Sequence, residues 1–309
     1  MKAAILAVFA AAAVSAWQGP VPSRLASGDF RGALIQLNTI PPDKRDAQWH
    51  MLASKAEDGL NDAAKAVDEA QQAIDLDPHS EPARLQLAQI FLTRNTPEAA
   101  YEIFSEALPL FPDSALIRLG AGLALNQLRR YGEAIPILKD CLRLNPNLGP
   151  AFDALGAAYL NSGDYETLLR EAAAYSRIHP DDFRGPYYEA SARVELSMDG
   201  AESETLLRRS VELNPEFAAA HTLLGRVLLN LSRVNEAIPE LAKAIRLRPG
   251  YAPAHLYLAA AYRKAGKPDL AREESREVAR LNEEENRPAP HLLYHRGSRP
   301  ASQSTTGQK

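Results

Sequence analysis

Apolar and small residues recur along the chain at a nearly fixed interval. The recurrence is clearest where segments such as LRLNP and IRLRP close on a proline. Successive closing prolines are 34, 34, 34, 35 and 34 residues apart: Pro78, Pro112, Pro146, Pro180, Pro215 and Pro249. A seventh ending, VARLN followed by Glu283, comes 34 residues later without its proline. Self-similarity at such a period is typical of a stack of identical supersecondary units.

The pattern predicts two short helices in each unit. Its apolar positions recur at spacings of three and four residues, which is the pattern of one helical face. A polar break separates the two helices, as in NSGDYE (161–166), and the closing proline ends the second helix. A column of small residues stands 24 positions before each ending, where we expect the two helices to cross closely: Ser54, Ala88, Gly122, Gly156, Ser191, Gly225 and Ala259.

The pattern resembles the tetratricopeptide repeat over roughly residues 27–283. The clearest unit, 149–180, carries the residues Phe152, Leu155, Gly156, Tyr159, Gly163, Asp164, Tyr165 and Pro180. The unit 218–249 matches with Leu224, Gly225, Ala237, Ala244 and Pro249. The resemblance implies an all-α fold, a right-handed solenoid of about seven and a half antiparallel helix pairs. The unit that ends at Pro215 departs from it with one extra residue, and its first helix fits best one place out of register.

The chain divides into four expected segments. Lys2, an apolar run and Ser15-Ala16 follow the pattern of a signal peptide (1–16), cleaved after Ala16, which predicts a periplasmic or secreted protein. The run is too short to cross a bilayer, and no other apolar run is long enough for a transmembrane span. A truncated capping helix pair (17–46), seven repeats (47–283) and a disordered tail (284–309) follow.

Composition gives no sign of catalytic or cofactor chemistry. Acidic and basic residues interleave to a net charge of −4, which does not indicate a nucleic-acid partner. No phosphate-binding loop, nucleophile motif or paired-carboxylate framework is present, so we expect no enzyme activity, cofactor or metal. His221 and His255 stand in a column that also holds Phe152, which favours packing over metal binding. The single cysteine, Cys141, occupies the same column as Ala107 and Ala244 and is expected to be structural.

By resemblance to the family, the first helices line a concave groove. Groove-facing residues then fall 23, 20 and 19 positions before each ending, or one place later in the irregular unit. In the six units after Pro78, the amide and cationic residues among them are Gln89, Asn126, Gln127, Asn161, Arg193, Arg226, Asn230, Arg263 and Lys264. Amide side chains can bond an extended peptide backbone, and cationic ones can hold acidic side chains or a terminal carboxylate. An acidic protein or peptide partner would therefore suit the C-terminal third.

The sequence predicts a non-enzymatic, exported scaffold that binds a partner polypeptide in its groove. One alternative is a substrate-recruiting or regulatory subunit of a separately encoded enzyme, such as a glycosyltransferase. Another is a cytosolic assembly adaptor, if the leader is not cleaved. The identity of the partner and the oligomeric state stay open.

Overall fold

The computed structural model describes residues 20–198 and 200–285. These residues form sixteen α-helices and one 3-10 helix (Pro42–Lys44), with no strand. The predicted leader and the tail after residue 285 lie outside the described residues. Within the described part, the prediction of an all-α stack of antiparallel helix pairs is confirmed.

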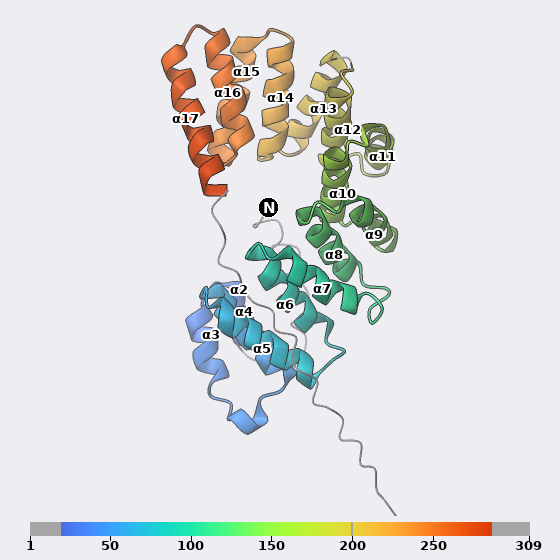
Figure 1. Cartoon of the computed structure of the whole chain (residues 1–309), viewed down its shortest axis with the longest axis vertical. Coiled ribbons are helices and arrows are strands. Elements are labelled where there is room, and N and C mark those ends of the chain that lie inside the picture. Colours follow the sequence, from blue (N-terminus) through green and yellow to red (C-terminus); the bar gives the residue numbers. More distant parts are fainter. Residues whose placement is uncertain (1–19, 199, 286–309) are drawn as a thin grey trace, which may run out of the picture.

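The helices alternate between two layers. The first helices of the pairs are α2 (Val21–Ala26), α4 (Ala47–Gly59), α6 (Glu81–Thr93), α8 (Ala115–Gln127), α10 (Gly149–Ser162), α12 (Arg184–Glu195), α14 (Ala218–Asn230) and α16 (Ala252–Lys264). The second helices are α3 (Phe30–Leu37), α5 (Ala63–Leu76), α7 (Pro97–Ala107), α9 (Tyr131–Leu144), α11 (Tyr165–Ile178), α13 (Gly200–Leu213), α15 (Val234–Leu247) and α17 (Pro268–Glu285). The chain curves from α2 round to α17 as an open superhelix (Figure 1).

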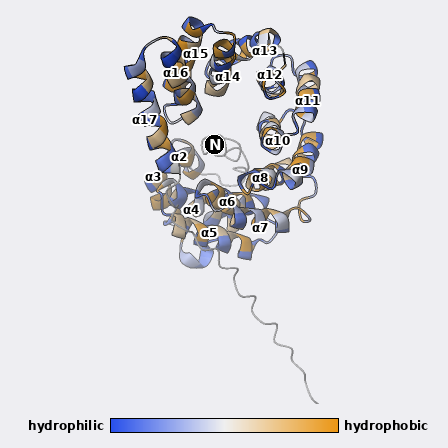
Figure 2. Ribbon diagram, turned by 45° about the horizontal axis from the view of Figure 1, so that its top comes forward, coloured by the Kyte–Doolittle hydropathy of each residue, from blue (hydrophilic) through white to orange (hydrophobic). Residues whose placement is uncertain are grey.

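The first helices make up the concave side. Each even-numbered helix from α4 to α14 contacts the next even-numbered helix as well as its neighbours in sequence. Figure 2 shows the even-numbered helices from α6 to α16 on the inside of the curve and the odd-numbered helices outside them. A surface that recognises another molecule across several units would therefore be built from the first helices.

A left-handed residue makes the turn within each pair. Positive φ angles occur 17 residues before the ending in six units, at Asn61, Asn95, Arg129, Gly163, Ser232 and Gly266. The next residue then donates its N–H back to the last turn of the first helix, as Asp164 N does to Tyr159 O at 3.1 Å. Only two of the six units use glycine, the residue that adopts this conformation without a steric cost.

The column of small residues lies where the paired helices meet, and all seven of its members are buried, as predicted. A Cβ built on Gly225 would stand 2.5 Å from Leu241 Cγ, on the second helix of the same pair. Gly122 faces Leu138 in the same way, at 2.4 Å from its Cδ2. The absence of a side chain at these positions is therefore what lets the helices approach.

The closing prolines end the second helices, as predicted. The residues before them have extended φ angles of −134° at Asp77, −138° at Asn145, −124° at His179 and −144° at Arg248. A proline disfavours the helical conformation in the residue that precedes it. The turn to the next pair therefore starts at the same place in these units.

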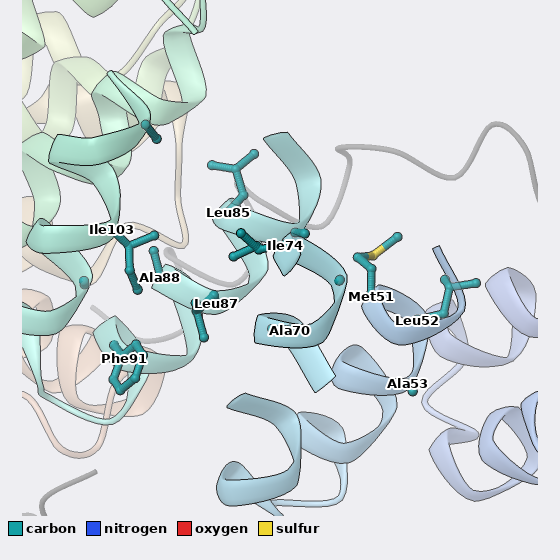
Figure 3. Close-up of a cluster of buried hydrophobic side chains, with 14 of the residues drawn as sticks. Met51, Leu52, Ala53, Ala70, Ile74, Leu85, Leu87, Ala88, Phe91 and Ile103 are labelled. Carbon is teal, nitrogen blue, oxygen red and sulfur yellow. The ribbon is translucent and has the colours of Figure 1, made fainter. Parts of the chain in front are cut away.

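Buried side chains form cores that pass from one pair to the next. One cluster runs from Val21 to Ala124, and Figure 3 shows its central part. There, side chains from four successive helices follow one another: Met51 and Leu52 on α4, Ala70 and Ile74 on α5, Leu85 and Phe91 on α6, and Ile103 on α7. Each pair thus buries its neighbours, as expected of a repeat array.

The two ends of the stack differ from its middle. The first helix of the N-terminal pair, α2, has only six residues and has a proline in its first turn. At the other end, α17 continues to Glu285, two residues beyond the predicted last ending. Leu256 on α16 is half exposed, whereas its counterpart 34 residues earlier, Thr222, is buried. The end face of α16 is therefore the face that a further pair would cover.

Candidate functional site

A small pocket opens between three first helices near the C-terminal end of the stack. It has a volume of about 180 Å³ and lies between α12, α14 and α16, with Leu160 of α10 at its edge. Tyr187, Tyr251 and Tyr257 supply most of its aromatic surface, and Leu223 adds an aliphatic wall. Because all of its helices belong to the inner layer, the pocket belongs to the concave side.

Neighbouring aromatic rings hold Tyr187 in place. Tyr187 meets Phe217 and Tyr188 edge to face, with ring centroids 4.8 and 4.9 Å apart. Burial raises the pKa of Tyr187 and of Tyr251, so both phenols remain neutral near pH 7. Neutral phenols combine an apolar ring with a hydroxyl that can donate one hydrogen bond.

An ion pair forms the polar rim of the pocket. Arg226 Nη1 donates to Glu195 Oε1 at 2.7 Å, which links α14 to α12. The guanidinium also lies over the Tyr257 ring, 5.9 Å from its centroid. About a third of each of the two charged side chains is exposed. The predicted groove residue Arg226 therefore lies at the pocket, but its charge is already balanced by a carboxylate.

Two other predicted groove residues bridge neighbouring first helices. Asn126 Nδ2 donates to Ala154 O of α10 at 2.8 Å. Lys264 Nζ donates to Leu229 O of α14 at 3.1 Å, and the lysine is exposed. Both side chains thus help to hold the inner layer together, and the lysine keeps two N–H donors for other partners.

The remaining amides differ in their access to the concave surface. Gln89 is only 8% exposed, which leaves little of it for a partner to touch. The Oε1 atom of Gln127 is buried and has no hydrogen-bond partner among the described residues. Asn161 is exposed, but its Nδ2 donates to Ala157 O of its own helix. Asn230 is exposed at the end of α14.

Two of the predicted groove residues lie away from the pocket. Arg193 turns toward the second helix of its own pair, where Nη1 contacts Glu202 Oε2 at 2.6 Å. The face of α12 that lines the pocket carries Tyr187, Ser191 and Glu195, so the shifted register points to a different face of this helix. Arg263 stands at the position that in the preceding pair holds Leu229, which is buried. It therefore lies on the end face of α16, where no further first helix follows among the described residues.

Sequence reasoning missed the tyrosines and Glu195. Tyr187 stands 28 positions before its ending, in the same column as His221 and His255, for which the sequence favours packing. Tyr251 stands in the link before α16, outside the groove columns. Glu195 stands 20 positions before Pro215, which is one of the groove positions when the irregular unit is given the same register as the others. The available signal was the aromatic residues of two units that lie one unit apart, Tyr187 in the first and Tyr251 and Tyr257 in the second.

The buried histidines join the two helices of a pair. In three pairs, 2.6 Å separates the histidine Nδ1 from a glutamate Oε2 of the second helix: His50–Glu69, His221–Glu240 and His255–Glu274. The other ring nitrogen of His221 and of His255 lies 3.0 and 2.8 Å from the carbonyl oxygen of the preceding closing proline. These histidines thus connect three segments of the stack.

Cys141 is fully buried, with its thiol 3.1 Å from Ala115 O. Burial raises the pKa of the thiol to about 12, so the reactive thiolate is scarce at neutral pH. The described residues contain no cluster of three or more potential metal ligands. Nor does any helix among them have the length and apolar character of a membrane span.

Models of the tetratricopeptide repeat match residues 59–123, 116–148, 199–252 and 228–286, together more than half of the chain. The chain belongs to the tetratricopeptide-repeat family. The family match and the stacked helix pairs both support a protein-protein interaction scaffold. They leave open which molecule this member binds.

Curated relatives share part of this array. Protein FlbA of Caulobacter vibrioides is 27% identical over 205 residues, which are 65% of this chain and 34% of FlbA. Superkiller protein 3 of Schizosaccharomyces pombe is 29% identical over 206 residues, 61% of this chain and 14% of that protein. Tetratricopeptide repeat protein 37 of Xenopus laevis is 28% identical over 144 residues, 42% of this chain and 9% of that protein. The chain spans about a third of FlbA and less of the other two.

Solved structures share the fold at low sequence identity. Yeast Tom70 superposes with a TM-score of 0.67 at 16% identity, over 91% of this chain and 65% of that one. A chain of the APC/C hetero-tetramer Cut9-Hcn1 superposes with a TM-score of 0.57 at 19% identity, over 78% and 48%. These similarities support the helical stack and carry nothing further about partners.

Proposed function

We propose that this protein is a scaffold that binds a segment of a partner polypeptide along its concave side, without catalysing a reaction. The observation that carries the proposal is the tyrosine-lined pocket between α12, α14 and α16. Aromatic rings supply large contact area at little entropic cost, which is why they dominate many binding sites. The pocket is also bounded by a rim that carries both charges, Arg226 and Glu195.

The experiment is affinity capture with a pocket variant and a matched surface variant. Leu223→Glu places a carboxylate on the wall of the pocket. Ile35→Glu makes the same change in charge on α3, where the isoleucine is 72% exposed. A partner that uses the pocket is retained by the wild-type chain and by Ile35→Glu, and is lost with Leu223→Glu. Equal retention by all three proteins would refute the proposed site, provided that circular dichroism shows all three folded.

We also propose that the protein acts outside the cytoplasm after removal of residues 1–16. The support is the order of a charged start, a short apolar run and small residues at the cleavage position. N-terminal sequencing of the protein from its native host tests this. A mature chain that begins at Trp17 is expected, and a chain that retains Lys2 would instead favour a cytosolic adaptor.

A further inference from the structure

We infer that the pocket binds a proline-containing segment in the polyproline II conformation, and that an acidic side chain three residues from the anchoring proline pairs with Lys264. The inference rests on the proposed function, because it names the ligand of the same site. It is carried by the size and lining of the pocket and by the position of Lys264 relative to Tyr257.

The pocket has the size for one or two side chains. Its volume of about 180 Å³ is well below the roughly 300–1,000 Å³ of sites for whole small molecules. Its polar wall residues are already satisfied: Ser191 donates to Tyr187 O and Thr222 donates to Ala218 O, both at 2.8 Å. The interior is therefore suited to an apolar side chain.

The aromatic lining favours a polyproline II segment. Such a segment has an apolar surface of proline rings and carbonyl groups that have no partner within the segment. The rings of Tyr187, Tyr251 and Tyr257 can pack on the prolines, and the phenol hydroxyls can donate to those carbonyls. Because polyproline II is already ordered in the free peptide, little conformational entropy is lost on binding.

Lys264 fixes where an acidic residue should lie. It follows Tyr257 by seven residues on α16, so the two side chains share one face of the helix, about 10 Å apart along its axis. Polyproline II repeats its side-chain direction every three residues, over about 9 Å. An acidic residue three positions from the anchoring proline thus reaches the lysine.

The charges near the pocket favour an acidic ligand. Arg226 is balanced by Glu195, whereas Lys264 has a backbone carbonyl as its partner and no carboxylate among the described residues. Exposed Asn230 follows Leu229, whose carbonyl accepts the lysine hydrogen bond, and it can bond the ligand backbone. The open cation is thus the feature that distinguishes an acidic proline-rich segment from a neutral one.

The inference is tested by fluorescence anisotropy with labelled ten-residue peptides and the full chain. The first peptides carry a proline pair and an aspartate three residues away, in either order, in a neutral polar context. Control peptides replace the aspartate by asparagine, replace the prolines by serine, or change the spacing to one or five residues. We expect one order of the first peptides to bind, and each control to bind at least tenfold more weakly.

Charge reversal separates a specific contact from general attraction. Lys264→Glu should weaken the aspartate peptide at least tenfold and should strengthen a peptide in which lysine replaces the aspartate. Arg263→Glu is the matched control, because it makes the same charge change on the end face of the same helix. It should alter binding no more than about twofold. Equal effects of the two variants would overturn the proposed contact with Lys264.

The outcomes also separate this inference from the proposed function. If no proline peptide binds while Leu223→Glu still abolishes capture of the native partner, the ligand class is wrong and the scaffold function stands. If the peptides do not bind and Leu223→Glu leaves capture unchanged, both fail. Binding by the serine controls at the strength of the proline peptides would also overturn the polyproline II assignment.

Discussion

Replacing Gly225 by alanine should destabilise the protein, although alanine is the better helix former. In a helix interior, the change from glycine to alanine normally stabilises by about 1 kcal/mol. At Gly225, however, the new Cβ would stand 2.5 Å from Leu241 Cγ and 2.7 Å from its Cδ2. The Cγ atom is not the far end of a flexible side chain, so relief requires the two helices to move apart. Overpacking of this kind costs about 1–3 kcal/mol, and we expect a net loss of about 1 kcal/mol.

Gly132→Ala is the matched control. Gly132 also lies in a helix, α9, but a Cβ at this position would meet nothing within 4 Å. Only the higher helix propensity of alanine then acts, and near the start of the helix we expect it to raise the unfolding free energy by about 0.5 kcal/mol. The two substitutions are chemically identical, so the difference in sign isolates the close approach of α14 to α15.

Urea unfolding followed by circular dichroism measures both variants. With a slope of about 3 kcal/mol/M for a chain of this size, the midpoint should fall by about 0.3 M for Gly225→Ala and rise by about 0.2 M for Gly132→Ala. The comparison holds only if the slopes agree, because repeat arrays can unfold in stages. A double-mutant cycle tests whether contact with Leu241 is the cause. In a Leu241→Ala background that contact is absent, so Gly225→Ala should no longer destabilise the protein. A rise of the midpoint for Gly225→Ala in the native background would refute the steric explanation.

Other predictions concern the buried polar groups and one turn. His221→Phe removes the hydrogen bonds to the Glu240 carboxylate and the Pro215 carbonyl, and should lower the unfolding free energy by about 2 kcal/mol in urea titrations; an unchanged midpoint would contradict this. The hydrogen bond with His221 lowers the pKa of Glu240. The stabilisation that this carboxylate gives is therefore present above its unfolded-state pKa and is lost as the pH falls through its folded-state pKa. Glu240→Gln should accordingly lose less stability between about pH 5 and pH 3 than the wild type. Burial raises the Cys141 thiol pKa to about 12, so a thiol reagent at pH 8 should label the chain only after unfolding, and rapid labelling of the folded chain would argue against it. Ser232 has a φ of 62°, so Ser232→Gly relieves the steric cost of a left-handed conformation and should raise the unfolding free energy by about 0.5–1 kcal/mol. A thermal melt with no gain would contradict this.

The stack was predictable because its determinants are local and repeated. A small residue at one position of each unit is needed wherever two helices cross, so seven copies of the same requirement appear in the sequence. Gly225 and Gly122 face leucines, whereas Ala259 stands in the last pair, where the residue equivalent to Leu241 is Ser275. Not every unit combines a glycine with a large neighbour, since the equivalent neighbours are Phe104 for Ala88 and Ala172 for Gly156. The sequence thus predicts where the helices cross, but not the size of each small residue.

The candidate site was harder to predict because it depends on which face each helix presents. The column of Arg263 faces the next first helix wherever one exists, as buried Leu229 shows. In the irregular unit, a register one residue later selects Arg193, which lies on the opposite face of α12 from Glu195. A rotation of 100° per residue makes such an error decisive for a surface position. Tyr187, in turn, comes from a different unit than Tyr251 and Tyr257, and only the stacking of the pairs brings the three rings to one pocket.

The polar residues of the inner layer have two roles that are linked. Arg226 and Lys264 each bind a neighbouring first helix, so they help to set the angle between successive pairs at the same place where the pocket forms. Each keeps further N–H donors, because a guanidinium has five and an ammonium has three. A ligand can therefore bind them without breaking the bridges on which the shape of the pocket depends. In a stack with contacts only between neighbours, this arrangement confines the effect of binding to the pairs from α12 to α17.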